Sequence, residues 1–336
     1  GSIEMANIPG WNLVGLPLEV ENSSYSDLFP TAVAGTLYGF NGTYTSESEL
    51  TPGAGYWLNF SDAGSTTITG STISSITVGL SQGWNLISGI SEVVDVASIS
   101  DPGSVVVPGT VYGFTGTYLN TSIIDPGKGY WINASGMGDI TISVSGTARL
   151  ASGFTDRTKG ANRLSFNGSD LYFGVSIPEE EIPSYQLPPK PPEGTFDVRF
   201  KDGWRLVKDY GEVQVMSTSE TLTIDYDIQV DAGSHYNWVL ISGTGGDYIL
   251  KNTGEIVVPS SDRFILKREP ALPETFTLYQ NYPNPFNPIT SLRYDLPERV
   301  QVTLAIYDML GREIAQLVNY TQEGGIKVVQ WDATDN

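Results

Sequence analysis

Hydrophobic and polar residues alternate with a period of two in short runs along most of the chain. Residues 196–200, 212–216, 221–226 and 263–267 are typical runs, and Gly, Asp or Ser residues lie close to many of their ends. Alternation of this kind puts one set of side chains on each face of a β-strand, and the flanking residues favour turns. The pattern therefore predicts an all-β protein, with a single helix-like turn around residues 314–318.

One pattern of blocks occurs twice in the first half of the chain. Gly-Trp-Asn-Leu begins at residues 10 and 83, Gly-Thr-x-Tyr-Gly-Phe-x-Gly-Thr-Tyr at 35 and 109, and Pro-Gly-x-Gly-Tyr-Trp at 52 and 126. The copies are therefore offset by nearly the same number of residues at every block, which indicates a tandem duplication. We expect a duplicated β domain over residues 1–148, with repeats at about 10–80 and 83–146.

The middle block of each copy predicts a β-hairpin. In the first copy, residues 41–42 are Asn-Gly, the favoured pair for a two-residue turn. That turn would place Tyr44 opposite Gly39, and the second copy would place Tyr118 opposite Gly113. An aromatic ring over a strand glycine would then fix the register of each hairpin.

The last block of each copy contains adjacent Tyr and Trp side chains, which point to opposite faces of a strand. One member of each pair is expected in the core and the other partly exposed. Exposed members could stack on sugar rings, which would make this half a carbohydrate-binding or adhesive module. Their position inside strands, where binding residues are less common than on loops, favours a core role instead. The ligand-stacking candidates are Tyr56, Trp57, Tyr130 and Trp131.

A second β module is predicted over residues 160–268, where short alternating strands and turn signals follow one another at the spacing of a β-sandwich. Residues 178–194 are rich in proline, which excludes a central strand or a helix interior. We expect this segment to run as polyproline II across a surface, with the acidic residues 179–181 solvated.

The last module is predicted over residues 276–336. Three prolines between residues 283 and 288 fix their φ angles and push the preceding residues into extended conformations, which gives a rigid lead-in. Alternating apolar residues at 292–296 and 300–306 predict two strands with inward faces. Residues 308–312, which include a glycine, predict the turn that closes the second strand.

These blocks closely resemble the type A C-terminal sorting domain of cargo exported by the type IX (Por) secretion system of Bacteroidota-like Gram-negative bacteria. The motif residues, in the family's order and at its spacing, are Tyr282, Pro283, Asn284, Pro285, Phe286, Asn287, Pro288, Tyr307, Asp308, Gly311, Arg312 and Trp331. The resemblance implies an immunoglobulin-like β-sandwich that the outer-membrane translocon recognises after Sec export. It also implies an extracellular or outer-surface location, reached through the periplasm.

The resemblance is not complete at the end of the chain. Family members continue past the Trp-Asp block with a glycine turn and a final aromatic-rich hairpin, whereas the sequence stops at Asn336. We therefore expect the sorting domain to lack its final strands and to leave one sheet edge unpaired. We expect Gly1 and Ser2 to be left over from expression. In the natural protein, we expect a cargo domain to precede this chain.

Composition excludes several classes of function. The net charge is −20 and the Lys and Arg residues form no stripe, so nucleic-acid binding is excluded. No run of 18 apolar residues exists, which argues against membrane insertion. The chain has no cysteine, so thiol catalysis and thiolate metal sites are excluded as well.

The sequence offers little catalytic chemistry, and no catalytic residue or cofactor is predicted. The single histidine, His235, lies in a turn without a convincing nucleophile beside it. Paired carboxylates of a polysaccharide-active enzyme would be close only in space, so this alternative stays open. Oxygen-rich loops at residues 95–101 and 167–170 could hold a structural Ca²⁺, although EF-hand spacing is missing.

The fold prediction is thus a multidomain all-β chain: a duplicated β domain followed by two immunoglobulin-like β-sandwich modules. The predicted function is the non-catalytic C-terminal region of a secreted cell-surface protein. It would supply spacer modules and a sorting domain that, when complete, binds type IX translocon components, because the family's recognition signal lies in the strands missing here. The duplicated half would bind polysaccharide in the alternative interpretation.

Overall fold

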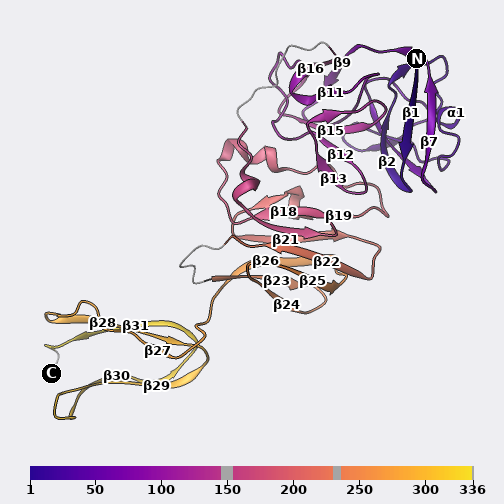
Figure 1. The fold of residues 1–336 in the computed structure, drawn as a ribbon. Coiled ribbons are helices and arrows are strands. Elements are labelled where there is room, and N and C mark those ends of the chain that lie inside the picture. Colours follow the sequence, from indigo (N-terminus) through magenta and orange to yellow (C-terminus); the bar gives the residue numbers. More distant parts are fainter. Residues whose placement is uncertain (145–153, 230–235, 335–336) are drawn as a thin grey trace. The chain divides into compact units, whose positions relative to one another are not determined.

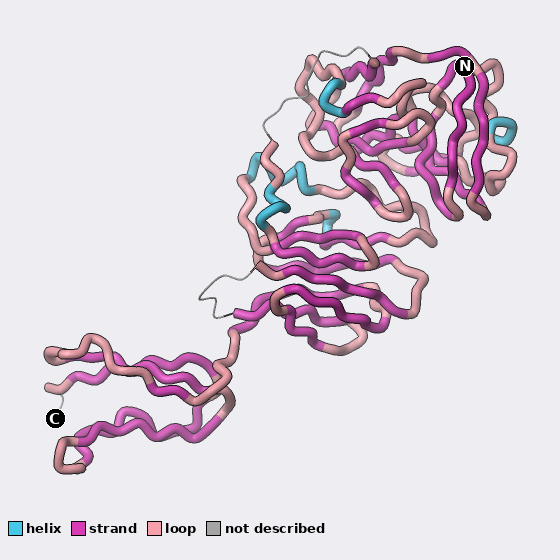
Figure 2. Tube along the Cα trace, in the orientation of Figure 1, coloured by secondary structure: helices cyan, strands magenta, loops and turns pink. Residues whose placement is uncertain are grey.

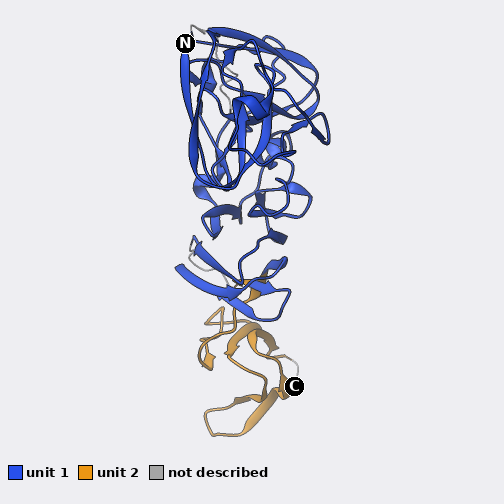
Figure 3. Cartoon of the chain, turned by 90° about the vertical axis from the view of Figure 1, so that its right-hand side faces the viewer, with its two compact units in different colours: residues 1–229, 240–267 blue, residues 230–239, 268–336 orange. Residues whose placement is uncertain are grey.

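The computed structural model describes residues 1–144, 154–229 and 236–334, and confirms that the chain is all-β (Figure 1). Strands dominate the trace, and the described residues contain one short α-helix, α1 (Tyr25–Leu28), with a few 3-10 turns (Figure 2). Two compact units can be separated (Figure 3). Unit 1 contains residues 1–229 and 240–267, and unit 2 contains residues 230–239 and 268–336. The three-domain division stays a prediction.

The duplication predicted from the sequence is visible as two four-stranded sheets with equivalent strand order. The first sheet runs β2-β6-β4-β5 and the second β10-β15-β12-β13. Leu13 pairs with Trp57 in the first sheet, as Leu86 pairs with Trp131 in the second. The strands are β2 (Gly10–Gly15), β4 (Tyr38–Phe40), β5 (Tyr44–Ser46), β6 (Gly55–Phe60), β10 (Gly83–Ser88), β12 (Tyr112–Phe114), β13 (Tyr118–Asn120) and β15 (Gly129–Ala134).

Two-stranded pairs complete the duplicated half: β1 with β7, β3 with β8, β9 with β16, and β11 with β14. Each repeat has its own hydrophobic core, built around Leu58 and Phe60 in the first and Ile132 and Ile140 in the second. The paired strands are β1 (Ser2–Asn7), β3 (Leu18–Glu19), β7 (Gly64–Thr69), β8 (Ser71–Thr72), β9 (Ser75–Leu80), β11 (Val94–Asp95), β14 (Ile123–Ile124) and β16 (Gly138–Ser143).

The predicted hairpin register is wrong in both repeats. Phe40 pairs with Tyr44, so the loop has three residues, with Gly42 in the left-handed region at φ +100°. Gly39 consequently faces Thr45 rather than a tyrosine. The ring of Tyr44 packs against Phe40, with 5.5 Å between ring centroids. In the second repeat, the equivalent shift pairs the strand glycine with a leucine instead of Tyr118.

The described residues between 162 and 270 form two five-stranded sheets, in the orders β20-β18-β17-β22-β25 and β19-β21-β26-β23-β24. Phe166 and Phe264, one from each sheet, meet edge to face with ring centroids 5.5 Å apart. This packing is that of a β-sandwich. The strands are β17 (Asn162–Phe166), β18 (Ser169–Phe173), β19 (Asp197–Phe200), β20 (Leu206–Val207), β21 (Tyr210–Met216), β22 (Thr221–Asp227), β23 (Tyr236–Ser242), β24 (Asp247–Leu250), β25 (Thr253–Pro259) and β26 (Arg263–Pro270).

The proline-rich segment is only partly as predicted. Its first part forms a 3-10 helix, η3 (Glu179–Tyr185), rather than polyproline II. The expectation of a fully solvated acidic run is also wrong, because Glu181 forms an ion pair with Arg157 at 2.7 Å between Oε2 and Nε. This side-chain pairing lowers the pKa of Glu181 from its usual value. The segment is therefore anchored where it enters the sandwich.

In unit 2, residues 277–332 form a three-stranded sheet, β27-β28-β31, and a two-stranded sheet, β29-β30. Tyr294 and Leu296 from the first sheet and Val318 from the second form the buried core between them. The helix-like turn predicted at residues 314–318 is wrong, because these residues lie inside a long strand. The strands are β27 (Thr277–Leu278), β28 (Ile289–Leu296), β29 (Val300–Tyr307), β30 (Glu313–Gln322) and β31 (Gly325–Asp332).

Candidate functional site

The residues predicted as a sorting motif gather at one end of unit 2. Strand β28 begins at this end and runs away from it, and β29 follows after a short turn and returns. Residues 308–312 therefore lie at the end from which β28 starts, as does Trp331, which pairs with Thr290. Figure 1 shows the start of β28 beside the end of β31 at the end of the unit marked C, and the β29–β30 turn at the same end but on the other sheet, apart from them. We call this region the motif end.

The lead-in is attached to the sheet by specific contacts. Tyr282 and Ser291 exchange backbone hydrogen bonds of 3.0 and 2.9 Å, and the Thr290 hydroxyl donates to the Pro283 carbonyl at 2.9 Å. The ring of Phe286 lies 5.4 Å from that of Trp331. The structure thus brings the proline-rich block and the Trp-Asp block of the motif into contact.

The turn between β29 and β30 is organised by Asp308. Its Oδ1 accepts hydrogen bonds from the backbone N–H groups of Leu310 and Arg312, both at 2.9 Å, and its Oδ2 accepts one from Arg312 Nε at 2.7 Å. These hydrogen bonds lower the pKa of the Asp308 carboxyl, and the two bonds from Arg312 have the largest effect. Gly311 takes φ +77°, which a side chain would strain. The turn predicted at these residues is confirmed.

The motif end leaves large apolar side chains in solvent. Met309 is fully exposed, Tyr282 and Leu310 are each 81% exposed, and Tyr307 is 58% exposed. Three of these residues, Tyr307, Met309 and Leu310, adjoin on one turn, and adjoining exposed apolar residues on a folded unit are typical of interaction sites. The Asp308 turn hydrogen bonds hold Met309 and Leu310 in this position, so their exposure follows from an ordered backbone.

The ligand-stacking candidates of unit 1 lie in the interior. Trp57 and Trp131 have no exposed surface, and Tyr56 and Tyr130 are 7% and 3% exposed. The expectation that one member of each pair would be partly exposed is wrong. Both tyrosines pack into the core of their own repeat. The tryptophans are covered by the other repeat, a partner that periodicity does not reveal.

The two repeats cover each other reciprocally. Phe40 of the first repeat meets Trp131 of the second, and Phe114 of the second meets Trp57 of the first, each pair edge to face at 4.8 Å. Backbones also approach closely, because a Cβ on Gly15 would lie only 2.1 Å from that of Ser88. The aromatic candidates therefore stabilise the pairing of the repeats, and their faces are closed to a sugar.

The second half of the proline-rich segment lies against this aromatic interior. We call residues 186–194 the strap. Tyr44 donates its hydroxyl hydrogen to the Lys190 carbonyl at 2.8 Å, and Tyr118 donates to the Pro189 carbonyl at 2.7 Å. Trp11 Nε1 donates to the carbonyl of Glu193 at 3.2 Å. Tyrosine and tryptophan donors on an aromatic surface are the groups by which proline-rich segments are generally held.

Burial raises the pKa of both strap-binding tyrosines. The pKa of Tyr44 is raised to about 12, and that of Tyr118 lies well above its usual value. The guanidinium of Arg199 adds a further anchor by donating to the Pro188 carbonyl at 2.7 Å. Its charge is balanced by Asp197 at 2.6 Å, and both side chains are only 5% exposed. The strap therefore joins the duplicated half to the sandwich within unit 1.

Comparison with protein-family models, curated proteins and solved structures finds no match to this chain. The sorting-domain resemblance accordingly stays a prediction that depends on the motif residues themselves. In the described part of the chain, no helix is both long and apolar enough to cross a membrane.

Candidate metal ligands in the described residues are engaged elsewhere. Asp101 accepts hydrogen bonds from the backbone N–H groups of Val105 and Val106, and Asp170 forms an ion pair with Arg163 at 3.1 Å. Over residues 1–144, 154–229 and 236–334, no group of three or more His, Asp or Glu side chains could hold a metal ion. The predicted calcium loops therefore gain no support. His235 lies outside the described residues.

Sequence reasoning missed the strap contacts altogether. The only available signal was the coexistence of a proline-rich segment with aromatic-rich repeats, a combination that could have suggested polyproline docking. It also missed the exposure of Met309 and Leu310, because an apolar pair inside a turn has no periodicity to reveal its direction.

Proposed function

We propose that the chain is a non-catalytic, secreted surface module in which unit 2 is a type IX sorting domain and unit 1 is a spacer. The main support for this proposal is the position of the motif residues at the motif end. Residues selected only by their resemblance to sorting domains, and separated by up to about 50 positions, gather at one end of a small sandwich. They leave Tyr282, Met309 and Leu310 exposed there.

The proposed partner is the type IX translocon in the outer membrane, which would place the chain outside the cell after passage through the periplasm. Exposed aromatic and aliphatic side chains on an ordered turn suit a protein partner, because burying them on binding releases water at little conformational cost. The strongly acidic composition is compatible with a chain that works in solution at a surface and does not bind nucleic acid.

The spacer role of unit 1 is supported by its closed interior. The repeats bury their aromatic side chains against each other, and the strap fixes them to the sandwich through hydrogen bonds from Tyr44 and Tyr118. A rigid unit of this kind would hold a cargo at a distance from the sorting domain. Polysaccharide binding through Tyr56, Trp57, Tyr130 or Trp131 would require the repeats to separate, so we do not favour this alternative.

An export experiment tests the proposal. A secreted reporter is fused ahead of the chain, and the terminal strands of an established type IX sorting domain are appended after Asn336. We expect the reporter to reach the cell surface in a type IX-competent bacterium and to stay in the periplasm of a translocon-deficient strain.

The matched control fusion lacks residues 276–334 but keeps the appended strands. Its reporter should remain in the periplasm of the competent strain as well. Equal surface export with and without these residues would contradict a sorting role for unit 2.

A further inference from the structure

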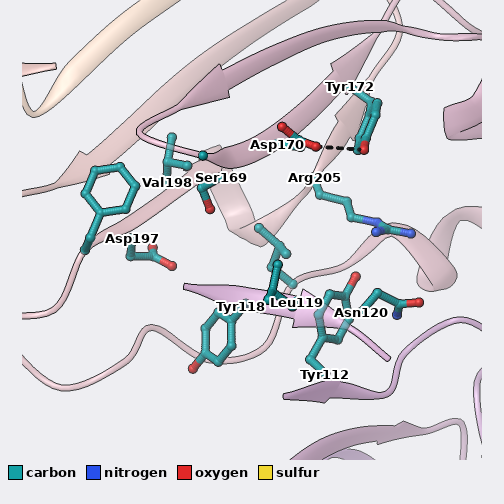
Figure 4. A pocket seen from close by; sticks show the side chains of 13 residues that line it. Tyr112, Tyr118, Leu119, Asn120, Ser169, Asp170, Tyr172, Asp197, Val198 and Arg205 are labelled. Carbon is teal, nitrogen blue, oxygen red and sulfur yellow. Dashed lines mark hydrogen bonds between the residues drawn. The ribbon is translucent and has the colours of Figure 1, made fainter. Parts of the chain in front are cut away.

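Unit 1 contains a polar cavity of about 150 Å³ between the second repeat and the sandwich (Figure 4). The second repeat contributes Tyr112, Tyr118 and Asn120 to its wall, and the sandwich contributes Asp170 and Arg205. The close-up shows the Arg205 side chain extending between Tyr172 and Tyr112, with Leu119 and Asn120 nearby. The cavity does not contain any of the predicted stacking residues.

Two hydrogen-bond donors at this cavity have no protein partner. Arg205 Nε and the hydroxyl of Tyr112 are both buried, and neither makes a hydrogen bond within the described residues. Tyr112 is only 1% exposed. Leaving such groups unsatisfied is costly, so unpaired donors on residues that line a cavity indicate that something else accepts from them.

The position of Arg205 is fixed by aromatic rings. Its Cζ lies 5.7 Å from the ring centroid of Tyr112 and 5.7 Å from that of Tyr185. Cation–π contacts of this kind orient a guanidinium without using its N–H donors. Arg205 is therefore held in place with hydrogen-bonding capacity left over.

The charges around the cavity leave one cation unbalanced. Asp197 is paired with Arg199 at 2.6 Å, and Asp170 with Arg163 at 3.1 Å. In the described part of the chain, no carboxylate lies within ion-pair distance of Arg205. An anionic acceptor would balance this charge in spite of the acidity of the whole chain.

We propose that this cavity binds a small carboxylate that also carries hydroxyl groups, such as a sugar acid. The carboxylate accepts hydrogen bonds from Arg205 Nε and the Tyr112 hydroxyl, which are both donors. The hydroxyl groups of the ligand face Ser169, Asn120 and Asp170, which line the same cavity. This site is independent of the proposed sorting function, since it uses no residue of unit 2.

The test measures binding of glucuronate to the full chain by isothermal titration calorimetry and ligand-observed NMR. Glucose, which lacks the carboxylate, and acetate, which lacks the hydroxyl groups, are the comparison ligands. We expect glucuronate to bind at least about tenfold more tightly than either, because a charge-assisted hydrogen bond is lost with glucose and several neutral ones with acetate.

Three variants locate the site. Arg205→Gln should weaken glucuronate binding by at least about tenfold, and Tyr112→Phe by about fivefold. Tyr38→Phe is the matched control, because Tyr38 is the counterpart of Tyr112 in the first repeat. Each tyrosine packs on a tryptophan at a similar distance, 5.8 Å for Tyr38 and 6.0 Å for Tyr112, but Tyr38 does not line the cavity.

Tyr38→Phe should leave binding unchanged, and unfolding midpoints confirm that each variant is folded. If Arg205→Gln does not fold, the comparison of Tyr112→Phe with Tyr38→Phe decides the result. The absence of saturable glucuronate binding, or binding that Tyr112→Phe leaves at the wild-type level, would overturn the proposal.

Discussion

The aromatic repeats of unit 1 and the motif end of unit 2 place their most prominent apolar side chains in opposite environments. In unit 1, Trp57 and Trp131 are completely buried, each against a phenylalanine of the other repeat. In unit 2, Tyr282, Met309 and Leu310 are mostly or fully exposed at the motif end. The comparison shows that richness in aromatic residues does not by itself indicate a binding surface.

The aromatic side chains of unit 1 are buried and those of the motif end are exposed because different structures cover the sheets of the two units. The duplication supplies unit 1 with a second copy whose sheet covers the first, so residues that would form a surface in a single repeat become core. In residues 277–332 of unit 2, two small sheets cover one face of each other and the core is formed by few side chains. The motif end is therefore a better candidate for a partner-binding surface than the aromatic repeats.

The largest effect is expected from Trp57→Ala. The substitution removes a fully buried side chain, its contact with Phe114 and its hydrogen bond to the Tyr44 hydroxyl, so unit 1 should lose about 5 kcal/mol of unfolding free energy. Denaturant unfolding followed by fluorescence measures this loss. Tyr282→Ala, at an exposed aromatic residue of unit 2, is the control and should leave stability nearly unchanged. Similar losses from both variants would remove the contrast between the units.

The buried ion pair gives the next effect. Arg199→Met leaves the Asp197 carboxylate buried without its cation and the Pro188 carbonyl without a donor, so unit 1 should be destabilised by about 3 kcal/mol. Arg299→Met breaks an exposed pair with Glu323 in unit 2 and should cause no measurable change. Unfolding curves of the two variants can be compared directly. An Arg199→Met protein as stable as the wild type would show that the Arg199 anchor of the strap contributes little to the unfolding free energy of unit 1.

Alkaline pH should destabilise unit 1. Burial raises the pKa of Tyr44 and of Tyr112 to about 12, whereas an unfolded tyrosine titrates near 10. Between these values the unfolded chain has lost protons that the folded chain keeps, so stability is fully present below pH 10 and falls as the pH rises to 12. Tyr112→Phe should reduce this loss by about 2 kcal/mol, as measured by urea unfolding at pH 8 and pH 11.5. An identical pH dependence in the variant would contradict the assignment.

The strap can be loosened by smaller changes. Tyr118→Phe removes the hydrogen bond to the Pro189 carbonyl and should cost about 1 kcal/mol. Because the effect is local, limited proteolysis at residues 186–194 should accelerate before global unfolding does. Tyr210→Phe, at an exposed tyrosine of the sandwich, should leave the cleavage rate unchanged. Equal cleavage rates in both variants would show that the tyrosine hydroxyls do not hold the strap.

Much of the fold follows from the sequence because its signals are local. Alternation predicted most sandwich strands, the constant offset predicted the repeats, and Gly311 with Asp308 predicted a turn that the structure confirms. The hairpin register could not be predicted, since a three-residue loop with Gly42 at positive φ competes with the two-residue turn favoured by its sequence. A loop that is longer by one residue shifts the register of the hairpin, so every residue faces a different cross-strand partner.

The candidate sites were harder to predict because they depend on contacts between distant residues. The burial of Tyr56 and Trp57 together requires a second sheet, and the anchoring of Glu181 requires Arg157 from another segment. The unpaired donors of Arg205 and Tyr112 become visible only when the second repeat and the sandwich are placed together. By contrast, the sequence was enough to select the sorting-motif residues. It could not predict that these residues lie at one end of unit 2.

The central claim is that the motif end of unit 2 is the surface by which the chain is recognised for export. Its most direct test is the surface export of the completed reporter fusion carrying Met309→Asp and Leu310→Asp. Both side chains are exposed, so the variant should unfold at the wild-type denaturant concentration while export falls to the level of the translocon-deficient strain. Wild-type export by this folded variant would contradict the claim.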